Sequence, residues 1–315
     1  MVIKKKLLGW GLAGLMSITA AQTALACAFH GYIPNPTLVD VLLRTEQVVV
    51  ARLSSGNGWQ YVPVETLMGF AVTEVPGTAS RSMRKQLRGD PSATVLLARD
   101  GAYGPWFEVA VLDAGYRTMV DEVLKRQTPW MFGDISDRLA FFAKRVNDPN
   151  PDIRRLALRE LDRVSYADLQ RARLPKVQNL QRDLTSGEAD LRPVRILLAG
   201  LSGDAAYVGP LQARMDQAFD DDTPYLGAYV TALIELQGKA AVEMIVQRYL
   251  LSGRASGQRT DKLMQALALQ YKSAPRGTRR TIAREVAALS RHSADFAQAT
   301  ATYFGYERGG RFASP

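Results

Sequence analysis

The chain has 315 residues, of which 47% are hydrophobic and 23% charged, a composition that excludes a disordered chain and leaves room for two folded domains. The formal net charge is +9, and three of these charges are the lysines at positions 4–6, so the chain after them carries +6. This excess is compatible with an acidic partner but is too small to identify one.

The first 26 residues have the three parts of a secretory signal peptide. Basic residues at 4–6 precede an apolar run over residues 7–21, and Ala24-Leu25-Ala26 places small residues where a signal peptidase requires them. The apolar run is shorter than the roughly 20 residues that span a bilayer, which favours a cleaved signal over a retained anchor. We therefore predict an exported protein, located in the periplasm of a Gram-negative bacterium, with no nucleic acid among its partners.

Cys27, the single cysteine, follows the predicted cleavage site directly, and two interpretations of it remain open. A cysteine at the new N-terminus can be modified with lipid, which would tether the protein to the membrane as a lipoprotein. The residues before it match such a lipobox only in part, since Ala24 stands where leucine is usual and polar Gln22-Thr23 precede it. The alternative is an unmodified exported chain. In either case one cysteine cannot form an internal disulfide, so the fold depends on its core alone.

Residues 27–130 are predicted to form a small β-rich α+β domain. Thr37 begins a short helix, and β-branched residues in alternation with polar ones mark the strands that follow. Pro63 cannot donate a ladder hydrogen bond, so its strand is expected at the edge of the sheet. The expected elements are strands at 46–53, 60–67, 71–75, 94–99 and 106–112, a helix or loop at 77–92 and a helix at 116–126.

Two runs in this domain carry a family resemblance. VVVARL at residues 48–53 and YVPVETLMG at residues 61–69 resemble the first strands of netrin-like modules, which have the oligonucleotide/oligosaccharide-binding (OB) fold. The resemblance implies an OB-like barrel for the N-terminal domain.

Residues 139–164 are predicted to form two amphipathic helices joined by a tight turn. Apolar residues recur at helical spacing in residues 139–146 and again in residues 153–164. Between them, Asn150 can cap the second helix, Pro151 suits its first position and Asp152 meets its positive end.

This pair resembles a HEAT repeat, a two-helix unit that stacks with its neighbours into a solenoid. The resemblance rests on Asp148-Pro149, Ile153-Arg154, Ala157 and Leu161. It implies an interaction scaffold rather than an enzyme.

Helical pairs are predicted to continue to the end of the chain, which gives an all-α second domain over residues 131–315. Similar phrases at 156–164, 195–203 and 231–242 place Leu161, Leu201 and Leu236 at intervals of 40 and 35 residues, the period of helical-pair repeats. We favour a short HEAT-like array of roughly four or five pairs, with a bundle that lacks superhelical order as the alternative. The expected helices after residue 164 span 169–184, 194–201, 208–219, 226–236, 241–250, 263–271, 282–289 and 296–304.

The sequence contains none of the common catalytic motifs: HExxH, CxxC, GxSxG and the phosphate-binding GxxxxGK[ST] are all absent. We therefore predict a protein that is not an enzyme and needs no cofactor. Asp220-Asp221-Asp222 lacks the spacing of a calcium loop and is expected to cap the helix that follows. After cleavage, Cys27 and His30 could together hold a soft metal such as copper, and this metal- or thiol-handling role is the main alternative function.

Two groups of side chains are candidates for contact with a partner. Arg155, Arg159 and Arg163 recur every four residues on the second helix of the lead pair. They either face an acidic partner, lipid or polysaccharide, or form a salt-bridged outer face. Tyr103 and Trp106 lie at the tip of the last predicted hairpin, where exposed aromatic residues are typical of a contact surface. The alternative for Trp106 is that it closes the end of the barrel.

We predict a non-catalytic exported scaffold that binds a protein partner of the cell envelope through its helical repeats. Membrane contact is expected only through lipid on Cys27. A second alternative is an enzyme acting on envelope polysaccharide, which needs paired carboxylates in a cleft. Its candidates are Glu65, Asp100, Glu108 and Asp113, although alternation places Glu108 opposite the expected core face.

Overall fold

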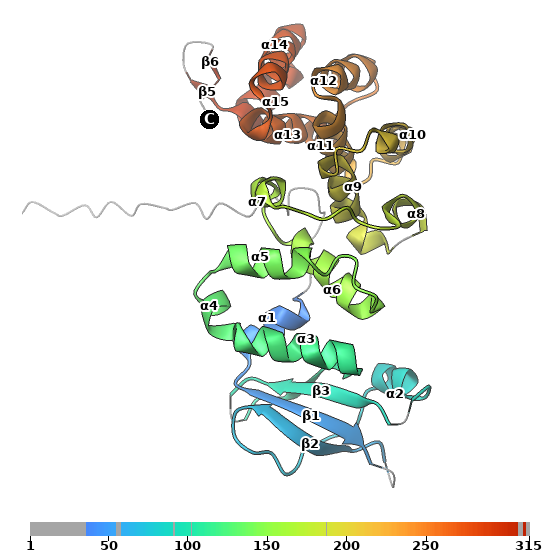
Figure 1. Ribbon diagram of the computed structural model, residues 1–315. Helices are drawn as coiled ribbons and strands as arrows, with labels where there is room; N and C mark the ends of the chain where they lie inside the picture. Colours follow the sequence, from blue (N-terminus) through green and yellow to red (C-terminus); the bar gives the residue numbers. More distant parts are fainter. Residues whose placement is uncertain are drawn as a thin grey trace, which may run out of the picture.

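The computed structural model describes residues 36–54, 58–90, 92–101, 103–186, 188–307 and 311–312. The predicted signal peptide, Cys27 and His30 lie outside these residues. Figure 1 shows a β-sheet at one end of the molecule, with the helices of the second half extending away from it. The protein is of mixed class, a small antiparallel sheet followed by a mostly helical region, as predicted.

The sheet has four antiparallel strands in the order β2-β1-β3-β4. Their bounds are β1 (Gln47–Leu53), β2 (Tyr61–Met68), β3 (Thr94–Arg99) and β4 (Trp106–Leu112). β3 and β4 have the predicted bounds, and β2 is an edge strand, as Pro63 indicated. Because β4 is the other edge and does not pair with β2, the sheet is open, and the described strands do not form the predicted OB-like barrel.

Residues 71–75 do not form the strand that we predicted. Just before these residues, the buried side chain of Gln47 forms hydrogen bonds with the backbone at Met68 and Phe70. Its Nε2 donates to the carbonyls of Met68 (3.0 Å) and Phe70 (2.6 Å), and its Oε1 accepts from the amide of Phe70 (3.1 Å). These bonds satisfy the backbone where β2 ends, so the chain can leave the sheet. Val75 then packs in a core that the sheet shares with α2 (Arg81–Leu87).

Helices cover both faces of the sheet. α1 (Leu38–Arg44) and α3 (Ala114–Lys125) lie on one face (Figure 1). α2 packs against the other face, in the smaller core. Successive residues of a strand point to opposite faces. Val50 and Leu96 accordingly belong to the main core, whereas Ala51 and Val95 belong to the smaller core with α2.

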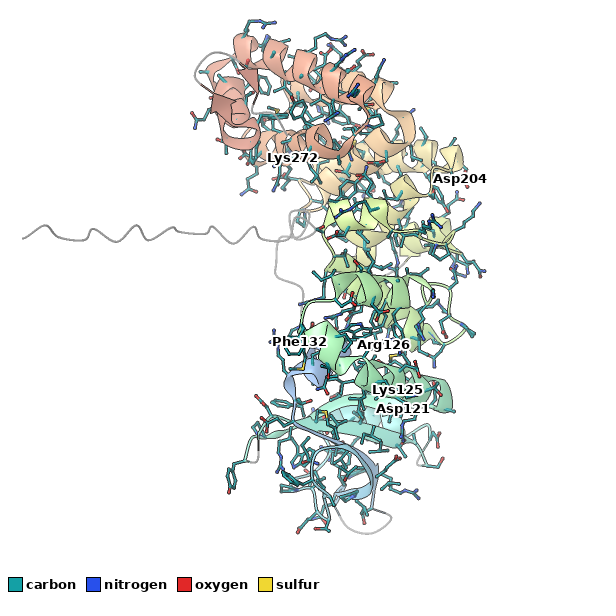
Figure 2. The ribbon with its side chains drawn as sticks, turned by 60° about the vertical axis from the view of Figure 1, so that its left-hand side comes forward. Asp121, Lys125, Arg126, Phe132, Asp204 and Lys272 are labelled. Carbon is teal, nitrogen blue, oxygen red and sulfur yellow. The ribbon has the colours of Figure 1, made fainter. Side chains whose placement is uncertain are left out.

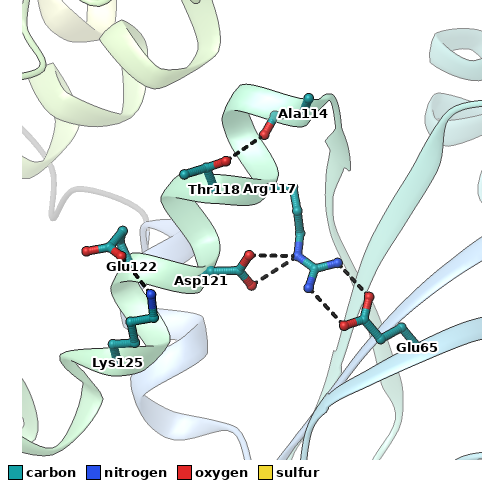
Figure 3. Close-up of polar contacts among 7 residues, drawn as sticks. All are labelled: Glu65, Ala114, Arg117, Thr118, Asp121, Glu122 and Lys125. Atoms are coloured by element: carbon teal, nitrogen blue, oxygen red, sulfur yellow. Dashed lines mark hydrogen bonds and ion pairs between the residues drawn. The ribbon is translucent and has the colours of Figure 1, made fainter.

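Polar contacts fix α3 to strand β2. Arg117 projects from α3, and its two Nη atoms donate to the carboxylate of Glu65 on β2 at 2.7 and 3.0 Å (Figure 3). Its Nε donates to Asp121, one turn further along α3, at 3.0 Å. The planar guanidinium group can satisfy both carboxylates at once. The hydrogen bonds from Arg117 lower the pKa of Glu65, so this carboxylate is ionised at neutral pH.

The helical region begins with α4 (Gln127–Met131), α5 (Ile135–Ala143) and α6 (Pro151–Asp162), of which α5 and α6 are the predicted lead pair. Asn150 caps α6, because its Oδ1 accepts from the amides at the start of this helix, and Pro151 occupies the first helical position, as predicted. The longer elements that follow are α7 (Tyr166–Arg171), α8 (Leu180–Ser186), α9 (Arg192–Leu201), α10 (Val208–Asp220), α11 (Leu226–Gln237), α12 (Lys239–Ile245), α13 (Gln258–Ser273), α14 (Arg276–His292) and α15 (Ala294–Phe304). Short elements are 3-10 turns at Ala189–Leu191 and Ala205–Tyr207, a π-helical turn at Val246–Leu250, and two-residue strands β5 (Tyr306–Glu307) and β6 (Arg311–Phe312).

Most of these helices are arranged in two rows. α6, α9, α11, α13 and α15 form a first row in which each helix contacts the next, and α8, α10, α12 and α14 pack along it (Figure 1). The phrases aligned at 156–164, 195–203 and 231–242 begin on α6, α9 and α11, three consecutive members of the first row. α9 and α11 approach closely at Gly200, since a Cβ built there would lie 2.5 Å from Ala232 Cα.

The predicted helix at residues 169–184 is wrong. α7 ends at Arg171, and residues 172–179 cross to α8 without helix or strand. Pro175 explains the break, because it has no amide donor and disfavours a helical conformation at Leu174.

The role predicted for Asp220-Asp221-Asp222 is also wrong. The N-cap of the next helix, α11, is Tyr225, and it receives no capping hydrogen bond from a side chain. Asp222 instead pairs with Lys262 at 2.8 Å, and Asp220 pairs with Arg254. The acidic run therefore ties the end of α10 to α13 and to the segment that precedes it.

The main hydrophobic core does not break at the predicted domain boundary between residues 130 and 131. Its buried residues extend from Leu38 in α1 to Phe304 in α15. At the boundary, the ring of Trp130 packs against Phe141 and Phe142 of α5, with ring centroids 5.3 and 5.9 Å apart. The sheet and the helical rows are thus joined through one apolar interior. Across the described ranges, no helix has the length and apolar character needed to cross a membrane.

Candidate functional site

At the junction between α4 and α5, one large apolar side chain is buried and three others are exposed to solvent. Trp130 is buried, and its indole N–H donates to the carboxylate of Asp137 (2.8 Å). Met131, Phe132 and Ile135 point outward instead, with 60%, 87% and 58% of their surface exposed. Figure 2 labels Phe132 at the edge of the molecule. Large apolar side chains gathered at the surface are typical of a contact site.

A cleft of about 1050 Å³ opens beside this junction. α5 forms one wall, and residues 171–175, the last residue of α7 and the segment after it, form the other. Leu139 and Ala143 line it from the α5 side and Leu174 from the opposite side. Ile135 belongs both to the cleft and to the exposed apolar group, so the two form one continuous surface.

One asparagine fastens the second wall of the cleft to the first. The Nδ2 of Asn147, which follows α5, donates to the carbonyl of Lys176 (2.9 Å), and its Oδ1 accepts from the amide of Gln178 (2.8 Å). Residues 172–179 contain no helix or strand, so these bonds hold a segment that has no ladder of its own. Asn147 therefore helps to set the width of the cleft.

Asn147→Ala is expected to loosen this wall while the protein stays folded. Loss of two hydrogen bonds at a partly exposed site should lower the free energy of unfolding by about 1–2 kcal/mol. Hydrogen exchange measured by mass spectrometry should become faster in peptides that cover residues 172–179. Exchange in α11 and α13 should stay as in the wild type, and unchanged exchange at 172–179 would contradict the role given to Asn147.

α7 is held against the first row of helices by a polar network. The Tyr166 hydroxyl donates to the carboxylate of Glu235 in α11. Nε2 of Gln270 in α13 donates to that hydroxyl (3.0 Å) and to Glu235 (3.1 Å), and Gln170 adds a bond of 2.8 Å to the same carboxylate. Burial raises the pKa of Tyr166 and Glu235 raises it further, so the phenol stays protonated and continues to donate. The network thus fixes the position of α7, and with it the point where the cleft wall at residues 171–175 begins.

Positive charge at the rim of the cleft is left uncompensated. The side chains of Lys144 and Arg173 have no hydrogen-bond or ion-pair partner among the described residues. The acidic residues of the rim are engaged, since Asp134 caps α5 and Asp168 pairs with Arg171. The cleft therefore combines apolar walls with free cationic groups.

A buried ionic network lies beside the cleft and joins α1 to α5 and α6. Arg138 of α5 donates through Nε to Glu160 (2.7 Å) and through Nη2 to Asp40 in α1 (3.0 Å). Arg163 lies 3.3 Å from the second oxygen of Asp40. Burial raises the pKa of Glu160 in spite of Arg138. Burial also acts to raise the pKa of Asp40, but the amide of Thr37 and the two arginines outweigh it and lower this pKa.

The structure separates the two aromatic residues predicted as contacts at the hairpin tip. Tyr103 is fully exposed. Trp106 is partly buried: it packs against the smaller core, and the guanidinium carbon of Arg99 lies 4.8 Å from its ring centroid. Tyr103 is thus available to a partner, whereas Trp106 has a packing role.

Arg155, Arg159 and Arg163, the arginines predicted to face a partner, are each paired with acidic side chains. Arg155 and Arg159 line a second cleft, of about 660 Å³, between α6 and the edge strand β4. These contacts agree with the salt-bridged alternative, because the charge of the three arginines is compensated within the chain. The pairs are Arg155 with Asp152 and Glu188, Arg159 with Asp190, and Arg163 with Asp40.

The carboxylates considered for polysaccharide chemistry serve mostly structural roles. Glu65 is held in the contacts of Figure 3, and Asp113 caps α3. Glu108 and Asp100 both line the cleft beside β4, but Glu108 accepts a hydrogen bond from the Tyr61 hydroxyl (2.8 Å). The polysaccharide alternative gains no support from these contacts.

Within the described ranges, no group of three or more His, Cys, Asp or Glu side chains is placed to hold a metal ion. The ligands suggested for a metal, Cys27 and His30, lie outside these ranges, so that role stays a prediction. Comparison of the chain with protein-family models, curated proteins and solved structures gave no match.

The junction of α4 with α5 and the wall at residues 171–175 are the parts of the site that sequence reasoning missed. Two signals were available: the apolar run at residues 130–132 that ends at Gly133, and the helix breaker Pro175. Neither signal indicates that the two segments meet, because they are about 40 residues apart in the chain and are joined only by packing.

Proposed function

We propose that the protein is a non-catalytic scaffold that binds a segment of another protein in the cleft between α5 and residues 171–175. The exposed group Met131, Phe132 and Ile135 at the mouth of this cleft is the observation that carries the proposal. Such side chains are unfavourable in water, and aromatic residues and methionine are enriched at protein interfaces.

The chemistry of the cleft selects the kind of segment that it binds. A short helix or extended segment with one or two large apolar side chains fits between Leu139 and Leu174, in the way that apolar grooves receive amphipathic peptides. An acidic side chain next to these anchors would meet Lys144 and Arg173. The partner segment is therefore apolar and acidic.

The same proposal extends to the architecture and the location of the protein. The two rows of helices would form a short HEAT-like solenoid, supported by the matching phrases that begin on α6, α9 and α11. A solenoid exposes a long surface while demanding little of any one residue, which suits a scaffold. Export is supported by the signal-peptide pattern of residues 1–26, and it places the partner in the cell envelope.

The combined variant Phe132→Ser/Ile135→Ser is expected to weaken binding of such a segment about 30-fold. Buried apolar anchors contribute about 2 kcal/mol or more to an interface, and both side chains are mostly exposed in the free protein, so its fold should be unaffected. Peptides would be selected from a displayed library on the wild-type chain, and their affinities for both chains measured by fluorescence anisotropy.

Phe70→Ser provides a matched control, because Phe70 is 89% exposed at the end of β2 and lies outside the cleft. The selected peptides should bind this variant as tightly as the wild type. Lys144→Glu/Arg173→Glu should repel the acidic peptides in particular. The cleft would be rejected as the site if the Phe70 variant lost as much peptide affinity as the Phe132/Ile135 variant. It would also be rejected if the selected peptides lacked large apolar side chains.

A further inference from the structure

The excess positive charge after residue 6 is located on two helices. Residues 258–292, which comprise α13 and α14, contain eight Lys or Arg and two Asp or Glu, a net charge of +6. The whole chain after residue 6 also carries +6, so all its other residues together are neutral. A concentration of charge of this kind creates a local field that the average charge of the protein conceals.

Most of these cations are not used to hold the fold together. Elsewhere, arginines such as Arg117 and Arg138 are paired with carboxylates. On the two helices, Arg284 pairs with Glu243, but five side chains have no hydrogen-bond or ion-pair partner among the described residues. These five are Lys272, Arg276, Arg279, Arg280 and Arg291. Figure 2 labels Lys272 in the helical end of the molecule, away from the sheet.

The arrangement of α14 presents its arginines on one side. Arg276, Arg280 and Arg284 are four residues apart, so they follow one exposed face of the helix. Ile282 and Val286, on the opposite face, are fully buried in the main core. α14 therefore offers a ridge of charge and has no free apolar face with which to enter a membrane.

Three of the arginines surround a small hollow at the start of α14. The hollow, of about 270 Å³, is lined by Tyr271, Arg276, Arg279, Arg280 and Ala283. The first turn of α14 contains no acidic residue, and its N-cap Pro275 makes no capping hydrogen bond. Cations at this end of a helix oppose the helix dipole and one another, so their presence costs stability. A bound anion would remove both penalties.

We propose that α13 and α14 dock the protein on a membrane surface of anionic phospholipids, with a head-group phosphate in the hollow at Arg276, Arg279 and Arg280. Guanidinium groups match phosphate oxygens in geometry and bind them with two hydrogen bonds. Clusters of four to eight basic residues on a helix bind anionic lipid surfaces by this attraction. Docking would leave the cleft at α5 free, so it is independent of the proposed scaffold function.

The surroundings of the ridge favour a lipid surface over other anionic partners. The centre of a protein interface is depleted of charge and rich in apolar residues, whereas the large exposed apolar side chains of the described chain all lie before residue 252. Single-stranded nucleic acid binds where exposed aromatic rings stack on its bases. Tyr271, the aromatic residue of the hollow, instead packs against Phe304 with ring centroids 5.9 Å apart.

Vesicle binding tests the proposal. The protein secreted by its host, carrying Cys27→Ser so that lipid on residue 27 cannot contribute, should bind vesicles that contain phosphatidylglycerol and not vesicles of phosphatidylcholine. In the same background, Arg276→Gln/Arg279→Gln/Arg280→Gln should weaken the partition constant about 100-fold, since each basic residue contributes about a factor of five. High salt should abolish the binding, because it screens the attraction.

The charge-matched control is Arg81→Gln/Lys85→Gln/Arg88→Gln, on α2 and its C-cap, which removes the same charge from exposed side chains without partners in the described chain. Its binding should change less than about 3-fold, and circular dichroism should show both variants folded. The proposal would be overturned if the two variants lost vesicle affinity equally, or if the protein bound neutral vesicles as tightly as anionic ones. Tighter binding to a DNA duplex than to anionic vesicles at the same salt concentration would also overturn it.

Discussion

Arg138→Ala is expected to lower the free energy of unfolding by about 3–5 kcal/mol, because it leaves the buried carboxylate of Glu160 without its counter-charge and Asp40 with Arg163 alone. Arg138 is the link between Asp40 and Glu160, whose side chains are almost completely buried. The loss would be measured by urea unfolding at neutral pH. Arg284→Ala is the matched control, since its ion pairs are mostly exposed and should contribute no more than about 1 kcal/mol.

The decrease in the free energy of unfolding caused by Arg138→Ala should become smaller as the pH is lowered. The pKa of Glu160 is raised in the folded protein, and removal of Arg138 would raise it further. Protonation then favours the folded state, so the penalty is complete above the folded-state pKa and disappears below the unfolded-state value of about 4.3. The pKa of Asp40 is lowered, so its stabilising contribution remains above about 3.9 and is lost only below that pH.

A second substitution separates the buried charge from other effects of the change. Arg138→Ala/Glu160→Gln should be more stable than Arg138→Ala alone at neutral pH, because the uncompensated charge has been removed. If the double variant is no more stable than the single one, the destabilisation comes from lost packing and not from the carboxylate.

Gly200→Ala is expected to lower the free energy of unfolding by about 1–3 kcal/mol through overpacking of α9 against α11. The added Cβ would lie 2.5 Å from Ala232 Cα and 3.0 Å from the Ala232 carbonyl oxygen. These are backbone atoms, so one helix must shift to make room. Thermal or urea unfolding would measure the change.

Gly209→Ala is the matched control, and it should change the free energy of unfolding in the opposite direction. Gly209 is also helical, in α10, but a Cβ there would meet no atom within 4 Å. The substitution should raise stability by about 0.4–1 kcal/mol, because it restricts the unfolded chain. A Gly200→Ala variant as stable as the wild type would mean that α9 and α11 are farther apart than described. Ala232→Gly should rescue Gly200→Ala only in part, because the nearest atom is a Cα.

Local patterns were sufficient for the elements whose stability is local. Alternation of apolar and polar residues predicted β3 and β4 with their observed bounds. Asn150 and Pro151 predicted the start of α6, since a cap depends only on neighbours in the sequence. Prediction was wrong at residues 71–75, because the side chain of Gln47 satisfies the backbone just before them, at Met68 and Phe70. It was also wrong at residues 169–184, because Pro175 interrupts the helix.

The ionic contacts show where sequence reasoning reaches its limit. The basic spacing of Arg155, Arg159 and Arg163 was evident, but its meaning depended on acidic partners from other segments. Arg138 meets Asp40 across 98 residues of chain, and Gln270 meets Tyr166 across 104. Such pairings arise when apolar faces pack and bring distant polar groups together, and no local pattern encodes them.

By itself, the sequence determined the class of fold, the order of most of its elements, the expected export signal and the positive charge of residues 258–292. The tertiary structure alone decided which apolar groups stay exposed at Phe132 and which charges stay unpaired at Arg276 and Arg280. The physical reason is that periodicity, capping and turn formation act between neighbours in the chain. Exposure and charge compensation depend on what the rest of the chain places beside each side chain.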